Sequence, residues 1–229
     1  MNFLASWFPH TILVGANILL LLILIKTAKP ALSAVHKRLP AFAAAAVALS
    51  ILWGLHVELG EGHLAGMTYH LLGISLVVLM LGAPAALWLG TLLLIPYTWL
   101  LHGVENLSVI GINTLALLLP SILLNLSVRR FSRRLPPHIF IYIFVNGFFT
   151  AAASMILTGI VLLLCLQFTG AYEPAVLWGN AFPVFFLLTW GEGFLSGIFT
   201  AIFVALAPQL LITYDDARYL QPKREIWKP

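Results

Sequence analysis

The feature of this sequence that most constrains its fold is a series of apolar runs, most of them about as long as a membrane is thick. A helix needs about 20 mainly apolar residues to cross the hydrocarbon core of a bilayer. The runs lack the alternation of polar and apolar residues that marks the strands of a β-barrel. They lie at about residues 10–28, 39–57, 69–82, 84–101, 107–128, 138–168 and 178–212. The sequence therefore predicts an all-α, polytopic membrane helix bundle with about seven transmembrane helices.

The scarcity of charge supports the same conclusion. Of the 229 residues, 61% are hydrophobic and only 9% are charged, whereas about a quarter are charged in an ordinary soluble domain. Seven spans fit this length only if most connections are short. We therefore expect a single transmembrane domain over residues 1–229, with a cytoplasmic tail at about 213–229. No Lys or Arg precedes the first run, so we expect a retained first helix rather than a signal peptide.

Helix-breaking residues separate the runs. The predicted breaks fall at Pro30 and Pro40, at Gly82, at Gly103, and at residues 136–137, which are both proline. The third run is short. The sixth and seventh runs exceed one membrane thickness, so we expect them to tilt or to extend beyond the lipid.

The charged residues between the runs predict the orientation of the chain. With seven spans, the basic residues of the first loop, the fifth loop and the tail all fall on one side. These are Lys26, Lys29, Lys37, Arg38, Arg129, Arg130, Arg133, Arg134, Arg218, Lys223, Arg224 and Lys228. The loop acids Glu58, Glu61, Glu105 and Glu173 fall on the other side. The positive-inside rule then predicts an external amino terminus and a cytoplasmic carboxyl terminus in a bacterial inner or plasma membrane.

The net charge of +4 needs no nucleic-acid partner, because the basic residues act as topology determinants and contact the lipid bilayer. No Gly-rich phosphate loop of the Walker type is present, so we do not expect this chain to hydrolyse ATP by that route. No Ser/His/Asp or paired acid/base motif is present either. The sequence therefore does not predict an enzyme.

Histidines and acids gather where the second run ends and the third begins. His56, His63 and His70 recur at seven-residue spacing, with Glu58 and Glu61 between them. Imidazole and carboxylate are ligands that divalent first-row metals use, so a metal site is one interpretation. The other is a polar outer loop, since its glycines prevent one continuous helix, and for all but His70 we favour this interpretation. His70 differs because it stands at a helix start beside small residues.

Two further polar positions lie inside apolar runs. Glu192 lies well inside the last run, between Gly191 and Gly193. An intramembrane carboxylate is by default a functional or network residue. A transport role and a hydrogen-bonding role in an unwound Gly-Glu-Gly turn are equally supported. For Asn113, interhelical hydrogen bonds suffice as an explanation.

Four stretches in order carry a resemblance to a known family. They are Gly-Met-Thr-Tyr-His-Leu-Leu-Gly at 66–73, Leu-Gly-Ala-Pro-Ala-Ala at 81–86, Leu-Ser-Val-Ile-Gly-Ile-Asn at 107–113, and Gly-Glu-Gly at 191–193 with Pro208 closing the last run. Together they resemble the CbiM/NikM family, the substrate-binding membrane components of energy-coupling factor (ECF) transporters for cobalt and nickel. The resemblance implies a membrane coupling (T) protein and cytoplasmic ATPase subunits as partners, and no resident cofactor.

The resemblance also implies site residues. In that family the metal is held near the outer face by the amino-terminal amine, by a histidine at position two with its backbone amide, and by a histidine that His70 matches. The amine of Met1 is available, but position two is Asn2, and an amide is a poorer ligand than imidazole. Either His10 or His63 replaces the missing imidazole, or the substrate differs.

The first hypothesis is therefore a component that captures a divalent transition-metal ion, such as cobalt or nickel, and passes it inward. The second is a divergent family member with an altered substrate or a regulatory or scaffold role. A haem-binding electron carrier needs two facing imidazoles at similar depth, and no clear deep pair is present. An intramembrane metalloenzyme using Glu58, Glu61, His63 and His70 lacks the usual spacing of two ligands on one helix.

Overall fold

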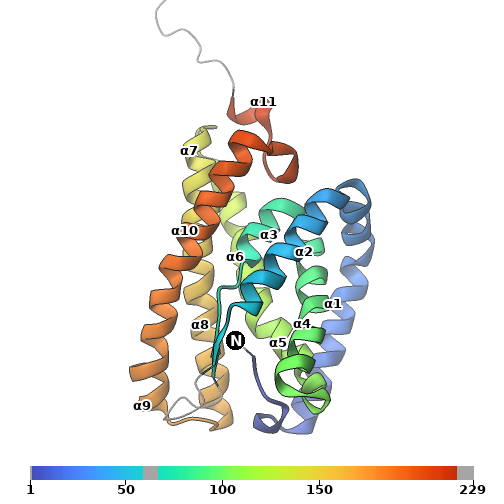
Figure 1. Cartoon of the computed structure of the whole chain (residues 1–229), viewed down its shortest axis with the longest axis vertical. Helices are drawn as coiled ribbons and strands as arrows, with labels where there is room; N and C mark the ends of the chain where they lie inside the picture. The colour runs from blue at the N-terminus through green and yellow to red at the C-terminus, as the bar shows by residue number, and fades with distance from the viewer. Residues whose placement is uncertain (1, 59–66, 221–229) are drawn as a thin grey trace, which may run out of the picture.

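The computed structural model describes residues 2–58 and 67–220, and it confirms the all-α class. Its helices run alongside one another, parallel or antiparallel to one long axis (Figure 1). In the described part of the chain, five helical segments are long and apolar enough to cross a membrane. They are His10–Lys37, Ala83–His102, Val104–Ser132, Ile139–Thr169 and Pro174–Leu206.

The five long segments contain the following elements. The first two are α1 (His10–Lys37) and α4 (Ala83–His102). The third comprises a 3₁₀ turn (Val104–Val109), α5 (Ile110–Asn113), a π turn (Thr114–Leu118) and α6 (Leu119–Ser132). The fourth comprises α7 (Ile139–Ile141), a π turn (Tyr142–Phe149) and α8 (Thr150–Thr169). The fifth comprises α9 (Pro174–Val176), a π turn (Leu177–Ala181) and α10 (Phe182–Leu206).

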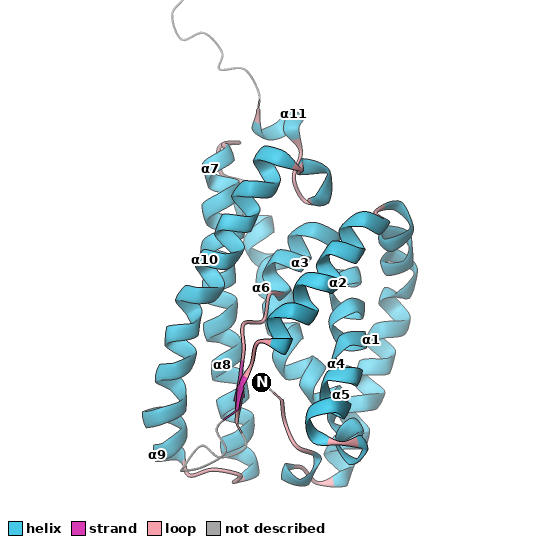
Figure 2. Ribbon diagram, in the orientation of Figure 1, coloured by secondary structure: helices cyan, strands magenta, loops and turns pink. Residues whose placement is uncertain are grey.

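The second and third predicted spans are shorter than expected. Helix α2 (Leu39–Gly54) ends before residue 57, and α3 (Ile74–Leu81) is the only helical part of the third span. Between them, β1 (Val57–Glu58) and β2 (Thr68–Tyr69) form an antiparallel pair, drawn in magenta in Figure 2. The prediction of a helix from residue 69 is wrong because the chain is extended there and turns at Gly73, whose φ of 66° is left-handed.

Most predicted breaks are present, but one is not. Gly82 and Gly103, with φ angles of 82° and 83°, separate helices as expected. Pro30 does not end α1, which continues to Lys37 and turns at Arg38. A proline inside a helix removes one backbone hydrogen bond, and membrane helices tolerate this when neighbouring groups compensate.

The last helix also ends earlier than predicted. Helix α10 stops at Leu206, and a 3₁₀ turn (Pro208–Leu210) and α11 (Asp216–Tyr219) follow. Between these turns, the backbone N–H groups of Ile212 and Thr213 donate to the carbonyl oxygens of Met80 and Leu79, at 3.1 and 3.3 Å. The carboxyl-terminal segment therefore satisfies carbonyl groups at the end of α3 that have no partner within that helix.

The basic ends of α1 and α6 lie at one end of the bundle, together with Asp215 and Asp216 of the carboxyl-terminal segment, and Glu105 and Glu173 lie at the other. Arg38 donates to the carbonyl oxygen of Gln209 at 2.7 Å, and Arg218 donates to that of Arg133 at 2.9 Å. The ends of α1 and α6 therefore meet the carboxyl-terminal segment at one end, the top of Figure 1. The segments that carry Glu105 and Glu173 lie at the other end.

Close packing of α5 on α1 leads to a prediction about stability. A Cβ atom at Gly111 would lie 2.6 Å from the backbone nitrogen of Asn17 and 2.7 Å from the carbonyl carbon of Ala16. Backbone atoms move less easily than side chains, so we expect Gly111→Ala to lower the free energy of unfolding by about 1 to 3 kcal/mol. Thermal unfolding in detergent measures the change.

The matched control is Gly15→Ala, because a Cβ at Gly15 has no atom within 4 Å. We expect this control to raise the free energy of unfolding by up to about 1 kcal/mol, because alanine is the better helix former and meets no obstacle there. Equal stability of the two variants would contradict the close approach of α5 to α1.

Candidate functional site

The first residues of the described chain enter the bundle. Asn2 is 5% exposed and Phe3 is fully buried. The backbone N–H of Phe3 donates to Oδ1 of Asn113 at 2.8 Å, and that of Ala5 donates to Oδ1 of Asn106 at 2.8 Å. Two asparagine side chains from the third long segment thus hold the amino-terminal segment in place.

The side chain of Asn2 is hydrogen-bonded at both ends of its amide. Its Nδ2 donates to Oγ1 of Thr98 at 3.1 Å, and its Oδ1 accepts a hydrogen bond from Nδ2 of Asn113. Thr98 is fully buried in α4, and Asn113 is fully buried at the end of α5. The amide side chain of Asn2 therefore belongs to a satisfied polar network.

His70 follows β2 and is 4% exposed. Its Nδ1 donates to the carbonyl oxygen of Leu71 at 2.8 Å. A carbonyl oxygen only accepts, so a hydrogen lies on Nδ1. A hydrogen bond at one ring nitrogen is how proteins fix the tautomer of a histidine that binds metal.

Aromatic side chains surround the imidazole of His70. The ring centroids of Trp53 and Tyr97 lie 5.8 and 5.4 Å from that of His70. His56 contacts the same tyrosine, with a centroid distance of 6.0 Å. The pairing of Val57 with Tyr69 makes His56 and His70 the next residues across the hairpin, which explains why both contact Tyr97. The rings of Trp53 and Tyr97 thus limit the orientations open to the His70 ring.

Glu192 fixes the segment that carries His70. Its Oε2 accepts from the backbone N–H of Leu72 and its Oε1 from that of Gly73, each at 2.8 Å. The indole N–H of Trp53 donates to the carbonyl oxygen of Leu72 at 3.0 Å. Glu192 is 1% exposed and its two acceptors meet the first N–H groups before α3, where the helix dipole favours negative charge.

The predicted unwinding around Glu192 is wrong, because α10 is a continuous helix from Phe182 to Leu206. The neighbouring glycine serves packing instead. A Cβ at Gly193 would lie 3.2 Å from Cβ of Ala152 and 3.4 Å from the carbonyl oxygen of Phe148. The helix therefore presents Glu192 to the His70 segment and glycine to the neighbouring helix.

The other predicted site residues occupy different surroundings. His10 is exposed at the first residue of α1, and Glu58 is exposed in β1. Met1, Glu61 and His63 lie outside the described residues. Among residues 2–58 and 67–220, no three His, Cys, Asp or Glu side chains form a group that could hold a metal ion.

Sequence reasoning missed Trp53, Tyr97 and Thr98. Tyr97 and Thr98 were detectable as adjacent polar groups inside an otherwise apolar run, directly after Pro96. His102 lies one turn beyond Thr98, at the end of α4. Its Nε2 is buried without a hydrogen-bond partner in the described part of the chain.

The comparisons with known proteins agree with this arrangement. Residues 4–210 match the family described as CbiM, cobalt uptake substrate-specific transmembrane region. A solved structure described as a truncated transition metal transporter has a TM-score of 0.67 and 17% sequence identity, over 90% of this chain and 97% of that chain. Another, described as a transition metal transporter, has a TM-score of 0.67 and 16% identity, over 92% and 93%. A search of curated proteins found no match.

The family match covers the segment after Phe3, the hairpin, the His70 segment and α10, which together form the site described above. The family is a membrane component of metal uptake and not an enzyme. The spanning helices make this chain a multi-pass membrane protein, as expected for a plasma-membrane transporter. The chain therefore belongs to the CbiM family of cobalt uptake substrate-specific transmembrane regions.

Proposed function

We propose that this chain is the substrate-capture component of an energy-coupling factor transporter, and that it takes up a divalent transition-metal ion such as cobalt or nickel. The observation that carries the proposal is the buried imidazole of His70, held through Nδ1 by the Leu71 carbonyl oxygen. An imidazole fixed in this way presents its second nitrogen as a metal ligand at little entropic cost.

The remaining ligands come from groups near the amino terminus. The amine of Met1 precedes the buried Asn2, and His63 lies seven positions before His70 in the sequence. His10 is a third candidate, because it follows the same amino-terminal segment. Asn2 itself contributes no imidazole, and its side-chain amide is occupied by Thr98 and Asn113.

The orientation that we propose has an external amino terminus, about seven passes and a cytoplasmic carboxyl terminus. The separation of basic and acidic segments between the two ends of the bundle supports it, since cytoplasmic loops carry the excess of Lys and Arg. Capture would then take place on the external side.

Partner subunits supply the energy in this proposal, because the sequence holds no Walker-type phosphate loop. A membrane coupling protein and cytoplasmic ATPase subunits would drive a reorientation that opens the site inward. Such a ligand release is a population shift between two states with different affinities for the ion.

The test is a metal titration of purified protein in detergent. We expect one equivalent of nickel or cobalt to bind the wild type and His70→Ala to bind at least about a hundredfold more weakly, since a ligand contributes more than the 10- to 100-fold of a supporting residue. Isothermal titration calorimetry and elemental analysis measure affinity and stoichiometry.

His36→Ala is the matched control, since His36 is exposed near the basic end of α1. We expect it to bind metal as the wild type does. If His70→Ala retains full stoichiometry and affinity, His70 is not a ligand and the proposed site is wrong.

The hydrogen bonds of Asn2 favour a second candidate function, in which the family fold serves a different substrate or a scaffold role. At position two this chain has an amide in place of an imidazole, and hydrogen bonds to Thr98 and Asn113 hold that amide in one orientation. Such a site offers a fixed polar group and one fewer metal ligand. Absence of nickel, cobalt, zinc and copper binding in the wild type would support this candidate over metal capture.

A further inference from the structure

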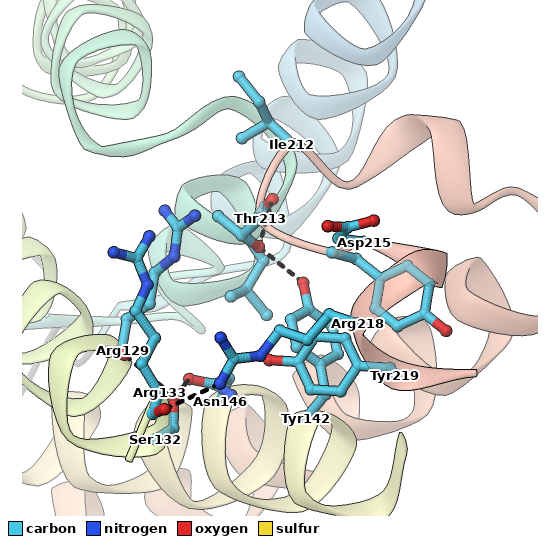
Figure 3. Close-up of a pocket in the computed structure, with 12 residues that line it drawn as sticks. Arg129, Ser132, Arg133, Tyr142, Asn146, Ile212, Thr213, Asp215, Arg218 and Tyr219 are labelled. Carbon is cyan, nitrogen blue, oxygen red and sulfur yellow. Dashed lines mark hydrogen bonds between the residues drawn. The ribbon is translucent and has the colours of Figure 1, made fainter. Parts of the chain in front are cut away.

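A polar cavity lies between the end of α6 and the carboxyl-terminal segment, at the basic end of the bundle. Its volume is about 390 Å³. Arg129 and Arg133 from the end of α6 line one side, and Arg218 of α11 lines the other, together with Asp215 (Figure 3). The cavity is separate from the His70 site and has no part in the proposed capture of metal.

The arginines of this cavity lack acidic partners. In the described part of the chain, Arg129, Arg133 and Arg218 form no ion pair. Asp215 uses Oδ1 to accept the backbone N–H of Ala217 at 3.0 Å, as the cap of α11. Three guanidinium groups and one carboxylate thus leave an excess of positive charge in a partly enclosed space.

One guanidinium is held in place across the cavity. Nη2 of Arg218 donates to the carbonyl oxygen of Arg133 at 2.9 Å, whereas Nε of Arg218 is buried without a hydrogen-bond partner among the described residues. A buried donor without an acceptor is unfavourable. An anion that enters the cavity would accept from this N–H and from the free arms of Arg129 and Arg133.

Hydrogen bonds between side chains hold the walls of the cavity around the arginines in place. Ser132 donates to Oδ1 of Asn146 at 2.9 Å, and both side chains are buried. The hydroxyl groups of Tyr142 and Thr213 lie 2.6 Å apart, so the carboxyl-terminal segment is fastened over the cavity. Arginines with a fixed fork geometry in such a space match the oxygens of a phosphate group.

We propose that this cavity binds a phosphate group, supplied either by the headgroup of an anionic lipid or by free phosphate. The position at one end of the spanning helices suits a headgroup, because headgroups lie at the level where these helices leave the hydrocarbon. The bound phosphate joins α6 to the carboxyl-terminal segment through their arginines.

The experiment uses the full chain, purified in a neutral detergent. The probes are inorganic phosphate, measured by equilibrium dialysis, and dihexanoyl phosphatidylglycerol, measured by native mass spectrometry, with dihexanoyl phosphatidylcholine as the uncharged comparison. We expect the wild type to bind at least one anionic probe. Arg129→Gln should bind about tenfold more weakly, as for the loss of one charge-assisted hydrogen bond.

Arg130→Gln and Arg134→Gln are the matched controls, because these arginines are exposed at the same helix end and do not line the cavity. We expect both to bind as the wild type does.

Arg133→Gln is the second test variant should Arg129→Gln fail to fold, and it should show a similar loss of anion affinity. If the wild type binds phosphatidylglycerol but not inorganic phosphate, the ligand is a lipid headgroup. If it binds both probes, the cavity recognises the phosphate group itself. Equal losses in test and control variants, or no binding of either probe, would overturn the proposal.

Discussion

Replacing Glu192 by alanine should lower the free energy of unfolding by about 2 to 6 kcal/mol, from two buried N–H donors left without acceptors at about 1 to 3 kcal/mol each. Both oxygens of Glu192 accept from the backbone before α3, and the side chain is 1% exposed. Thermal or denaturant unfolding in detergent measures this change.

The same variant tests whether Glu192 positions the imidazole of His70 for metal binding. Glu192 holds Leu72 and Gly73, which directly follow His70 and Leu71. Glu192 does not itself bind the ion in this scheme, so its loss acts through the orientation of the imidazole. If Glu192→Ala folds, we expect metal affinity to fall by about 10- to 100-fold, the usual effect of losing a supporting residue.

Two controls define this prediction. Glu192→Gln keeps one carbonyl acceptor but turns an amide N–H₂ toward a backbone donor, so its stability should lie between wild type and Glu192→Ala. Glu173→Ala removes an exposed carboxylate that makes no capping bond, and it should change stability by less than about 0.5 kcal/mol. Wild-type stability in Glu192→Ala would contradict the anchoring role.

The class of the fold was predictable because lipid imposes it. Continuous apolar runs without alternation leave only helices that satisfy their own backbone groups. The third run shows where this reasoning stops. Residues 69–82 are apolar throughout, but hydropathy does not distinguish an extended buried segment from a helix. Glu192 supplies the acceptors that the extended backbone at Leu72 and Gly73 needs, from 120 and 119 residues away.

The candidate site was predictable in part. His70, Asn113 and Glu192 stand out in the sequence because polar groups are unfavourable in lipid. Which residues pair with them was not predictable, since helix packing brings together residues such as Asn2 and Thr98 that are 96 positions apart. Trp53 and Tyr97 were missed for the same reason. Aromatic residues at the ends of spans are common, and only the fold shows that these two enclose His70.

Replacing Asn113 by alanine should release the amino-terminal segment from the bundle. Asn113 accepts the backbone N–H of Phe3 and donates to Asn2, so the variant removes two hydrogen bonds that a buried segment needs. Loss of about 2 to 3 kcal/mol of local stability corresponds to exchange of the Phe3 amide roughly a hundredfold faster. Hydrogen exchange followed by mass spectrometry of the amino-terminal peptide measures it.

The controls for Asn113→Ala distinguish local release from general destabilisation. Asn113→Asp keeps the oxygen acceptor for Phe3 but loses the donor to Asn2, so its exchange should be intermediate. Asn180→Ala changes an exposed asparagine and should leave the peptide protected. Because the proposed ligands include the amine of Met1, metal affinity should fall in step with the exchange rate across the series. Unchanged protection of Phe3 in Asn113→Ala would show that apolar contacts alone hold the segment, such as that between the rings of Trp7 and Tyr172 at 5.6 Å.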